Sequence, residues 1–253
     1  MLYENRFKKA IELRHAQFGL WSSLCSPVAT ELLSDVGFDW ILYDSEHSPV
    51  EVAGLLPLLQ AGAAGSAHAV VRPAANDPVL IKRVLDLGAQ TILVPFVQSA
   101  NDARAAVSYT RYPPHGIRGV AGITRASRYG RSQDYLKRAD EVTCLLVQIE
   151  TRDALAEIDS IARVDGVHGI FIGPSDLAAS FGHIGNPSHP DVQGAIAEAV
   201  RLLLQLGKPA GILANSIDAA KRYINWGFTF VAVATDLGLL SVAAAGALAQ
   251  VKT

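Results

Sequence analysis

Three ionisable side chains stand close together in the stretch YDSEHSP, residues 43–49, which overlaps the end of the apolar run FDWILY. They are Asp44, Glu46 and His47. His47 is a candidate general acid or base because the reference pKa of imidazole, about 6.5, lies near neutrality. A carboxylate at Asp44 or Glu46 could fix the tautomer of the ring and tune its basicity. The simpler alternative is that a strand ends at the surface, where charged residues are common.

Two further carboxylates follow later apolar runs, Glu150 after LLVQI and Asp176 in GPSD. If these runs are neighbouring strands, about 5 Å apart, the two carboxylates can converge on one cation. Without a His or Cys beside them they form an oxygen-only site, which suits Mg²⁺ or Mn²⁺, with Co²⁺ as a further candidate, better than structural zinc. Each also has a simpler interpretation, because Glu150 could favour the start of a helix and Asp176 could be an N-cap.

Arg72 ends the apolar run VVR, where an unpaired guanidinium would be costly to bury. A substrate carboxylate, which arginine can bind in a bidentate manner, is one possible partner, and a salt bridge to a carboxylate such as Glu46 is the other. Gln148 and Trp21 stand at the ends of two further runs. None of the lysines falls within such a run, so a Schiff-base mechanism has no obvious nucleophile. We expect no organic cofactor.

Eight short apolar runs position these residues, and amphipathic helical periodicity separates most of them. The predicted strands are residues 18–21, 39–44, 69–73, 91–95, 145–150, 169–174, 211–214 and 230–236. The predicted helices are residues 27–35, 50–61, 78–87, 100–109, 152–163, 192–206 and 217–226.

This alternation predicts the fold. Strands that are apolar on both faces and alternate with helices imply a parallel sheet. Eight such units in 253 residues predict one (β/α)8 barrel, a TIM barrel, as a single domain over residues 1–253. A leading helix over residues 5–15 is expected to close the bottom of the barrel. The reactive groups of such barrels lie at the C-terminal strand ends, which is where the polar residues described above collect.

Composition limits the kind of partner. Half of the residues are hydrophobic and 18% are charged, which allows a large core, and the net charge of -2 gives no reason to expect nucleic acid or a membrane as partner. The two cysteines have no disulfide or zinc spacing, and no signal peptide or membrane span is evident, so we expect a cytoplasmic protein acting on a small molecule. The arginine-rich insert over residues 111–138 is expected to form a subunit interface or a lid over an anionic substrate.

Taken together, these motifs resemble the HpcH/HpaI aldolase family of metal-dependent pyruvate aldolases. The similarity runs nearly end to end, and VQIE followed by FIGPSDL at this spacing is specific by itself. The segments that carry it are GLW, GFDWILYDSEHSP, VVRP, NDPVLIKRVLDLGAQTILVPFVQ, RYPPHGIRGV, LLVQIE, GVHGIFIGPSDL and FVAVATD.

The resemblance implies a class II retro-aldol reaction that reversibly cleaves 4-hydroxy-2-oxo acids to an aldehyde and pyruvate, or a related 2-oxo acid such as hydroxypyruvate. A metal-dependent 2-oxo acid decarboxylase or an acyl-CoA lyase on the same barrel is the alternative. Glu150 and Asp176 would bind the divalent metal. The pyruvyl half would be held by Arg72, Gln148 and the backbone of Gly173, Pro174 and Ser175.

The resemblance also assigns roles to residues around this centre. His47, oriented by Asp44, would take the proton from the hydroxyl whose carbon leaves as the aldehyde. Asp86 would reach the site from a neighbouring subunit of a homo-hexamer built as a dimer of trimers. Trp21 and Leu213, at the ends of the first and seventh strands, would contact the substrate.

One position departs from the family pattern. The relatives read D-G-E-H where this chain reads D-S-E-H, so Ser45 replaces a glycine. A serine could stiffen the turn that aims His47, because glycine has more backbone freedom than any other residue.

Overall fold

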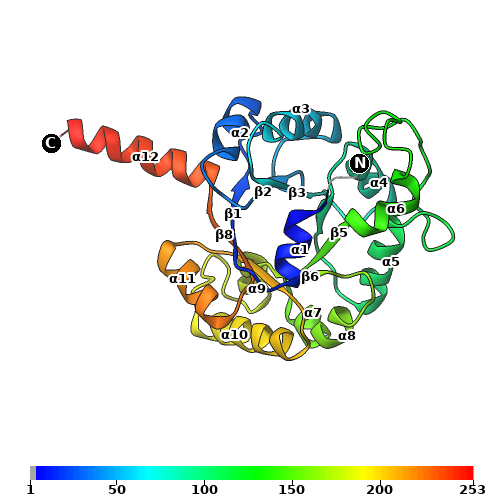
Figure 1. Ribbon diagram of the computed structural model, residues 1–253. Helices are drawn as coiled ribbons and strands as arrows, with labels where there is room; N and C mark the ends of the chain where they lie inside the picture. The colour runs from blue at the N-terminus through cyan, green and yellow to red at the C-terminus, as the bar shows by residue number, and fades with distance from the viewer. Residues whose placement is uncertain (1–3, 253) are drawn as a thin grey trace.

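In the computed structural model, which describes residues 4–252, eight parallel strands close into a barrel (Figure 1). Strands that follow one another in sequence pair with one another, and β8 pairs with β1 to complete the closure. The predicted barrel is confirmed, with every strand within a few residues of its expected place. The strands are β1 (Gln17–Ser22), β2 (Trp40–Asp44), β3 (His68–Arg72), β4 (Thr91–Val94), β5 (Cys144–Ile149), β6 (Gly169–Ile172), β7 (Ala210–Leu213) and β8 (Phe230–Thr235).

Helices surround the barrel, and the helices α6, α9 and α12 were not predicted. The helix expected over residues 152–163 is divided at Glu157 into α7 and α8. Within the described residues, no helix has both the length and the apolar content that crossing a membrane requires. The helices are α1 (Arg6–Glu12), α2 (Pro27–Ser34), α3 (Val52–Gly62), α4 (Pro78–Asp86), α5 (Ala100–Thr110), α6 (Tyr135–Val142), α7 (Arg152–Ala156), α8 (Ile158–Ala162), α9 (Pro174–Ser180), α10 (Pro190–Gln205), α11 (Ile217–Trp226) and α12 (Asp236–Val251).

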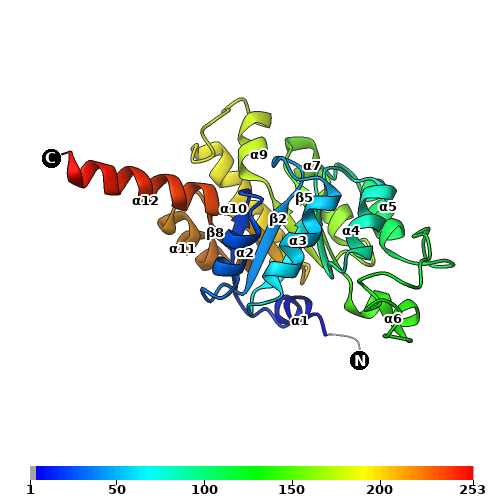
Figure 2. The same ribbon diagram turned by 90° about the horizontal axis from the view of Figure 1, so that it is seen from above.

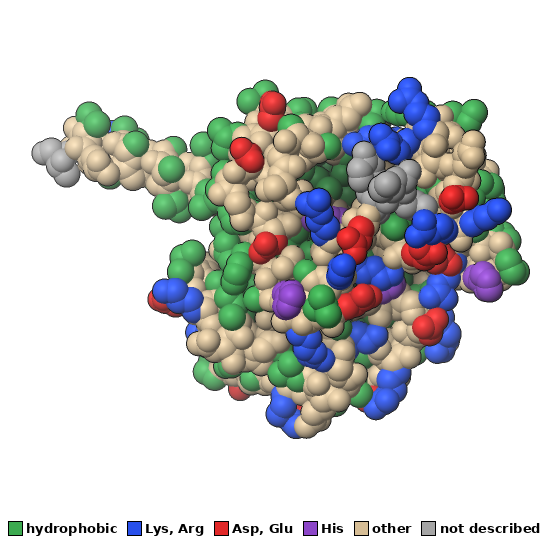
Figure 3. Space-filling view, in the orientation of Figure 1, with side chains coloured by type: hydrophobic (Ala, Val, Ile, Leu, Met, Phe, Trp, Pro, Cys, Tyr) green, Lys and Arg blue, Asp and Glu red, His purple; other side chains and the backbone are tan. Residues whose placement is uncertain are grey.

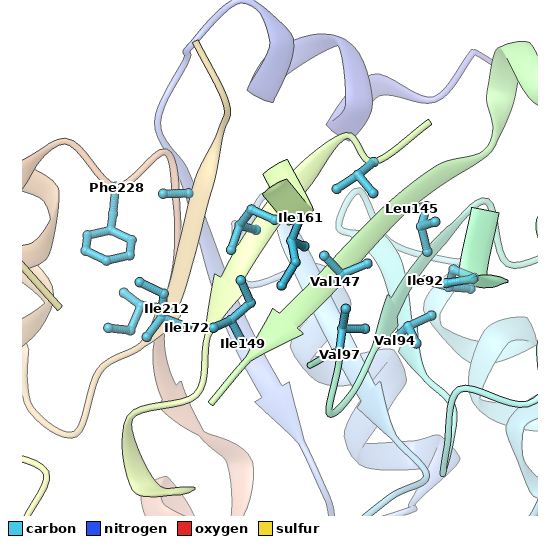
Figure 4. Packing of buried hydrophobic residues seen from close by; sticks show 14 of the residues in the cluster. Ile92, Val94, Val97, Leu145, Val147, Ile149, Ile161, Ile172, Ile212 and Phe228 are labelled. Atoms are coloured by element: carbon cyan, nitrogen blue, oxygen red, sulfur yellow. The ribbon is translucent and has the colours of Figure 1, made fainter. Parts of the chain in front are cut away.

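Side chains alternate between the inside of the barrel and the layer between strands and helices, as the period of two in a β-strand requires. In β2, Trp40 and Leu42 belong to the inner cluster, whereas Ile41 and Tyr43 pack in the outer layer. Figure 4 shows this outer layer around β4, β5, β6 and β7, where Ile161 of α8 lies among the strand residues. The same alternation turns the side chain of Asp44, at the end of β2, toward the barrel interior.

Helix α1 covers the N-terminal end of the barrel, as predicted (Figure 2). Phe7 and Ile11 join the inner cluster, where the ring centroid of Phe7 lies 5.9 Å from that of Trp40 and 5.6 Å from that of Phe230. Asn5 caps the helix by accepting from the backbone N–H of Lys8, and its amide donates to β4 and to the end of α6. This end of the barrel is therefore closed, and access to the interior is left to the opposite end.

The arginine-rich insert lies at the closed end of the barrel, so it is not a lid over the site of its own chain, and the alternative of a subunit interface stays a prediction. The insert connects the end of α5 to the start of β5, and connections that lead into a strand lie at the N-terminal face of a barrel. Arg125 donates to the carbonyls of Leu59 and Leu87, near the ends of α3 and α4. It also borders a cavity of about 530 Å³ at this end.

Two half-buried histidines, His68 and His168, stand beside or within the strand starts. His68 hydrogen-bonds to Thr91 and stacks on Phe7, and His168 accepts from the backbone N–H of Leu145. Burial lowers the pKa of each from its usual 6.5 to about 4, and the charges of Lys8 and Lys208 contribute at His168. Both imidazoles are therefore neutral in the folded protein at neutral pH.

We predict that His68 makes the protein less stable as the pH falls from 6.5 to 4.5. In this range His68 takes up a proton in the unfolded chain but stays neutral in the folded protein, because folding lowers its pKa. The free energy of unfolding therefore falls, by at most about 3 kcal/mol. Glu150, whose pKa is raised, acts in the opposite sense. Urea unfolding of the wild type and of His68→Gln should therefore be compared across this range. The wild type should lose more stability than the variant, with exposed His15→Gln as control, and parallel curves would contradict the prediction.

Candidate active site

Asp44, Arg72 and Gln148 enter the barrel at its open end from the C-terminal ends of β2, β3 and β5. Asp44 stands opposite Arg72 in the register of the two strands. Glu150 follows β5 by one residue, on the same face as Gln148. All four side chains are buried, with 5% or less of each residue exposed. The strand ends thus bring these predicted residues into one group.

The centre of this group is an ion pair between Arg72 and Asp44. Nε and Nη2 of Arg72 donate to the two carboxylate oxygens of Asp44, at 2.9 and 2.7 Å. The guanidinium lies 4.6 Å from the ring of Trp21, and the indole N–H of Trp21 donates to Asp44 at 3.2 Å. Burial alone would raise the pKa of Asp44, but the hydrogen bonds and charge of Arg72 outweigh it and hold this pKa below its usual value.

Asp44 therefore occupies the Nε–Nη2 edge of Arg72, and of the two partners that the sequence left open, a protein carboxylate is the one present. Nη1 is the remaining nitrogen, and it lies 2.8 Å from a carboxylate oxygen of Glu46 and 3.5 Å from the side-chain oxygen of Gln148. The alternative of a salt bridge to Glu46 is found in the structure. Burial raises the pKa of Glu46, although Arg72 and His47 act against this.

Glu150 is held by two donors and faces the barrel interior. One carboxylate oxygen accepts from the backbone N–H of Phe96 at 3.0 Å, and the other accepts from the side-chain amide of Gln148. Burial raises the pKa of Glu150 to about 7; the Gln148 bond opposes this, and the charges of Asp176 and Glu46 add to it. Thr151 caps α7, so the interpretation of Glu150 as a residue that merely favours the helix start is not supported.

Phe96 is a member of this site that the sequence did not reveal. It follows β4 with a φ of 52°, in the left-handed region, and this conformation accompanies the N–H bond to Glu150. A residue other than glycine held there costs about 1 to 3 kcal/mol, and such strain tends to occur at functional sites. Pro95 and Phe96, which follow β4, carry no ionisable side chain, so only their position at a strand end could have indicated their involvement.

Asp176 approaches Glu150 from the next strand. It is exposed in the first turn of α9, whose N-cap is Gly173, so the interpretation of Asp176 as an N-cap is wrong. A Cβ atom on Gly173 would lie 2.6 Å from a Glu150 oxygen, so only glycine allows the backbone to pass this close. Pro174 and Ser175 begin the same helix. The two expected metal ligands therefore lie near each other, and the Asp176 charge raises the pKa of Glu150.

The His47 side chain is exposed, and its ring makes no contact with Asp44. The expected pairing of the His47 ring with Asp44 is therefore not present in the structure. Both Asp44 oxygens are taken by Arg72, and the carboxylate nearest to the ring is that of Glu46, 3.9 Å from Nε2. Asp44 instead accepts from the backbone N–H groups of Glu46 and His47, at 3.0 and 3.3 Å. Asp44 thus shapes the turn that carries His47.

Ser45 adds a second restraint to this turn. Its hydroxyl donates to the carbonyl oxygen of Arg72 at 2.7 Å, beside a bond from its own backbone N–H to the same oxygen at 3.0 Å. The serine that replaces the family glycine therefore ties the turn to the end of β3.

The remaining predicted residues fall into two groups. Leu213 packs against the inner cluster that contains Trp21, which places both at the interior of the barrel. Asp86 ends α4 at the closed end, and its carboxylate lies 2.8 Å from the guanidinium of buried Arg118. Within one chain Asp86 is thus far from the strand ends, and its expected role across a subunit boundary stays a prediction.

A closed parallel barrel with charged side chains at its open end defines a (β/α)8-barrel enzyme. The chain belongs to the HpcH/HpaI aldolase/citrate lyase family, whose sequence profile matches residues 17–243. This confirms the resemblance inferred from the motifs.

Individual relatives agree with this assignment. The pyruvate aldolase of Rhizobium etli is 53% identical over 237 residues, covering 94% of this chain and 93% of that protein. The 4-hydroxy-2-oxo-heptane-1,7-dioate aldolase of Klebsiella pneumoniae is 53% identical over 238 residues, covering 94% and 90%. The crystal structure of a family protein from Burkholderia cenocepacia is 38% identical with a TM-score of 0.96, covering 98% of this chain and 100% of that one. The chain is therefore an enzyme, a carbon–carbon lyase of the aldolase type.

We predict that the hydroxyl of Ser45 stabilises the β2 turn. Ser45→Ala should lower the free energy of unfolding by about 1 kcal/mol, because one hydrogen bond is lost. Ser45→Gly should cost roughly 0.5 to 1 kcal/mol more, because glycine also frees the backbone. Urea unfolding measures both, and Ser45→Thr, which keeps a hydroxyl, is the matched control. Equal stability of the alanine and threonine variants would show that the bond contributes nothing.

Proposed function

We propose that the enzyme is a divalent-metal-dependent aldolase that reversibly cleaves 4-hydroxy-2-oxo acids to an aldehyde and pyruvate, or a related 2-oxo acid such as hydroxypyruvate. The observation that carries this proposal is the buried chain of contacts from Asp44 through Arg72 and Gln148 to Glu150 at the barrel mouth. This chain of contacts places the carboxylate of Glu150, which could bind a cation, near the fixed positive charge of Arg72. The aldolase names of the relatives support the same reaction class.

The residues at the mouth fit a divalent ion. Glu150 is buried, its pKa is raised, and the charges of Glu46 and Asp176 add to that rise, so a cation would relieve the crowding of negative charge. Glu150 and Asp176 would hold the ion, and their oxygen donors favour Mg²⁺ or Mn²⁺, with Co²⁺ as a further candidate. When bound, such an ion would polarise the 2-oxo group and stabilise the negative charge that develops on it.

Arg72 and Gln148 would hold the 2-oxo acid. Asp44 occupies the Nε–Nη2 edge of Arg72, so a substrate carboxylate would approach from the Nη1 side and take the place now held by Glu46. A guanidinium that is already fixed in place needs little reorganisation to stabilise negative charge that develops beside it. The backbone around Ser175 in the first turn of α9 would provide further donors.

His47 would act as the base, because its side chain is 66% exposed at the barrel mouth and its ring is free to meet a substrate. Removal of the proton from the C4 hydroxyl would form the aldehyde carbonyl and break the C3–C4 bond. The bonding electron pair then passes to the 2-oxo acid as an enolate, beside the positive charge of Arg72, and protonation at C3 completes the product.

Pyruvate release tests the proposal. Purified enzyme with Mg²⁺ or Mn²⁺ and a set of 4-hydroxy-2-oxo acids should release pyruvate, measured with lactate dehydrogenase, and a chelator should abolish the release until metal is restored. His47→Asn should lower kcat by about a hundredfold or more, yet keep the thermal shift that metal produces, with exposed His115→Asn as control. No pyruvate from any of these acids would overturn the proposal. Carbon dioxide or free CoA as the product would favour the decarboxylase or acyl-CoA lyase.

We also propose that the enzyme is a homo-oligomer, with a hexamer of two trimers as the expected assembly, and that it works in the cytoplasm with both cysteines reduced. The support for assembly is α12, which projects away from the barrel (Figures 1 and 2). Its side chains beyond Asp236 are exposed, and apolar side chains are visible along it in Figure 3. Leu240 and Val242 are 57% and 74% exposed, which a neighbouring copy would cover.

Charges on α12 should separate the subunits. In an isolated chain, Leu240→Asp and Val242→Asp would alter only exposed positions and change stability by about 0.5 kcal/mol or less. If a neighbouring copy covers α12, the double variant should instead have a smaller mass in light scattering. Leu13→Asp, an exposed leucine outside α12, is the control. An unchanged mass of the α12 variant would contradict the role of α12 in assembly.

A further inference from the structure

Two histidines and an aspartate come together between α9 and α10. The rings of His183 and His189 stack with centroids 3.4 Å apart and planes at 14°. A carboxylate oxygen of Asp191 lies 3.4 Å from Nε2 of His183 and 3.7 Å from Nδ1 of His189. The ligand atoms of these three side chains all lie within 4.8 Å of one another, and among the described residues no second group of three His, Cys, Asp or Glu is this compact. None of its members belongs to the active-site group.

The local backbone holds these side chains in place. Helix α9 ends at a left-handed Gly182, with a φ of 81°, and the N–H of His183 bonds back to the last turn of α9. His189 is the N-cap of α10, and its Nδ1 accepts from the N–H of Asp191 at 3.2 Å. Two successive turns, through Asn186, join the histidines. The cluster thus rests on two helix ends, whose backbone bonds fix the positions from which the three side chains extend.

The spacing and the donor types suit a transition metal. A neutral imidazole is the form of histidine that binds metals, through either ring nitrogen. With metal–ligand bonds of about 2.1 Å, the ligand atoms of a tetrahedral site lie about 3.4 Å apart. The observed distances of 3.4 and 3.7 Å from Asp191 to His183 and His189 match this edge. Because the lone pairs of an imidazole lie in its ring plane, one of the two stacked rings would turn out of the stack to bind the same ion. Two imidazoles and one carboxylate select borderline ions such as Zn²⁺ over Mg²⁺.

We propose that His183, His189 and Asp191 bind one divalent transition-metal ion of the Zn²⁺ type, in a site separate from the oxygen site of Glu150 and Asp176. The fourth position would be open to water, because Asp191 is 65% exposed. Nδ1 of His189 could not bind the ion and also accept from the backbone N–H of Asp191. That N–H would then donate to water at this exposed helix end. The inference does not depend on the proposed aldol reaction, since it uses other residues.

The site would connect metal binding to the barrel mouth. The hydroxyl of Ser188, next to His189, accepts from the side-chain amide of Asn215 at 3.4 Å. Asn215 follows β7 by two residues, and Leu213 at the end of β7 packs against the barrel interior. A bound ion would therefore stiffen the α9–α10 connection beside the mouth and raise the melting temperature.

Zinc titration of the full-length enzyme tests the proposal, with millimolar Mg²⁺ present to occupy the oxygen site. Calorimetry should show one Zn²⁺ bound per chain under these conditions. His189→Asn keeps an N-cap residue on α10 but removes the imidazole, and should weaken binding by about a hundredfold or more. His183→Asn should do the same without touching the cap. His115→Asn, which removes an exposed histidine elsewhere, should bind Zn²⁺ as the wild type does.

Absorption spectra of the Co²⁺-substituted enzyme give an independent readout, since a four-coordinate site has intense visible bands that both ligand variants should lose. Circular dichroism without metal checks that the variants fold, and their pyruvate release with Mg²⁺ should equal that of the wild type. The proposal is overturned if Mg²⁺ displaces all Zn²⁺, or if His183→Asn and His189→Asn bind Zn²⁺ as tightly as His115→Asn. Loss of pyruvate release in every protein, with zinc binding intact, would count against the aldol reaction alone.

Discussion

A guanidinium enclosed within a barrel is the constraint on which the site depends. Arg72 is 5% exposed, and a buried charge of this kind persists only with compensating partners. Asp44 neutralises it and Trp21 covers its face. Gln148 accepts from Arg72 and donates to Glu150. Because each member fixes the next, loss of Asp44 would disturb Arg72, Gln148 and Glu150 together. The enzyme therefore gains a preorganised positive charge whose position is set by β2 and β3.

Much of this arrangement could be predicted from the sequence, because parallel strands impose two simple rules. Alternation places every second residue inside, so Asp44, Arg72 and Gln148 share the interior with Trp40 and Leu42. Strand polarity then gathers their C-terminal ends at one face. Both rules need only the positions of the apolar runs, and these were read correctly for all eight strands. The grouping of the charged residues followed without knowledge of any contact.

What the sequence could not supply was the choice among partners. Asp44 was expected to orient His47, but its carboxylate pairs with Arg72 on the next strand, because a buried guanidinium requires a compensating charge and the exposed ring of His47 does not. The charge of the insert left a subunit interface and a lid equally open, and only its connection from α5 to β5 excludes a lid over the site of its own chain. Helix α12 was missed because its run is apolar on every side, without the periodicity that marks a helix packed on one barrel.

The bond from the Phe96 amide to Glu150 has an evolutionary consequence. A backbone amide is common to every residue except proline, and the side chain of Phe96 is 60% exposed. The residue at this position can therefore drift while the hydrogen bond is inherited unchanged, and glycine or asparagine would adopt its backbone angle with less strain. The architecture of the site is in this respect more durable than the sequence that encodes it.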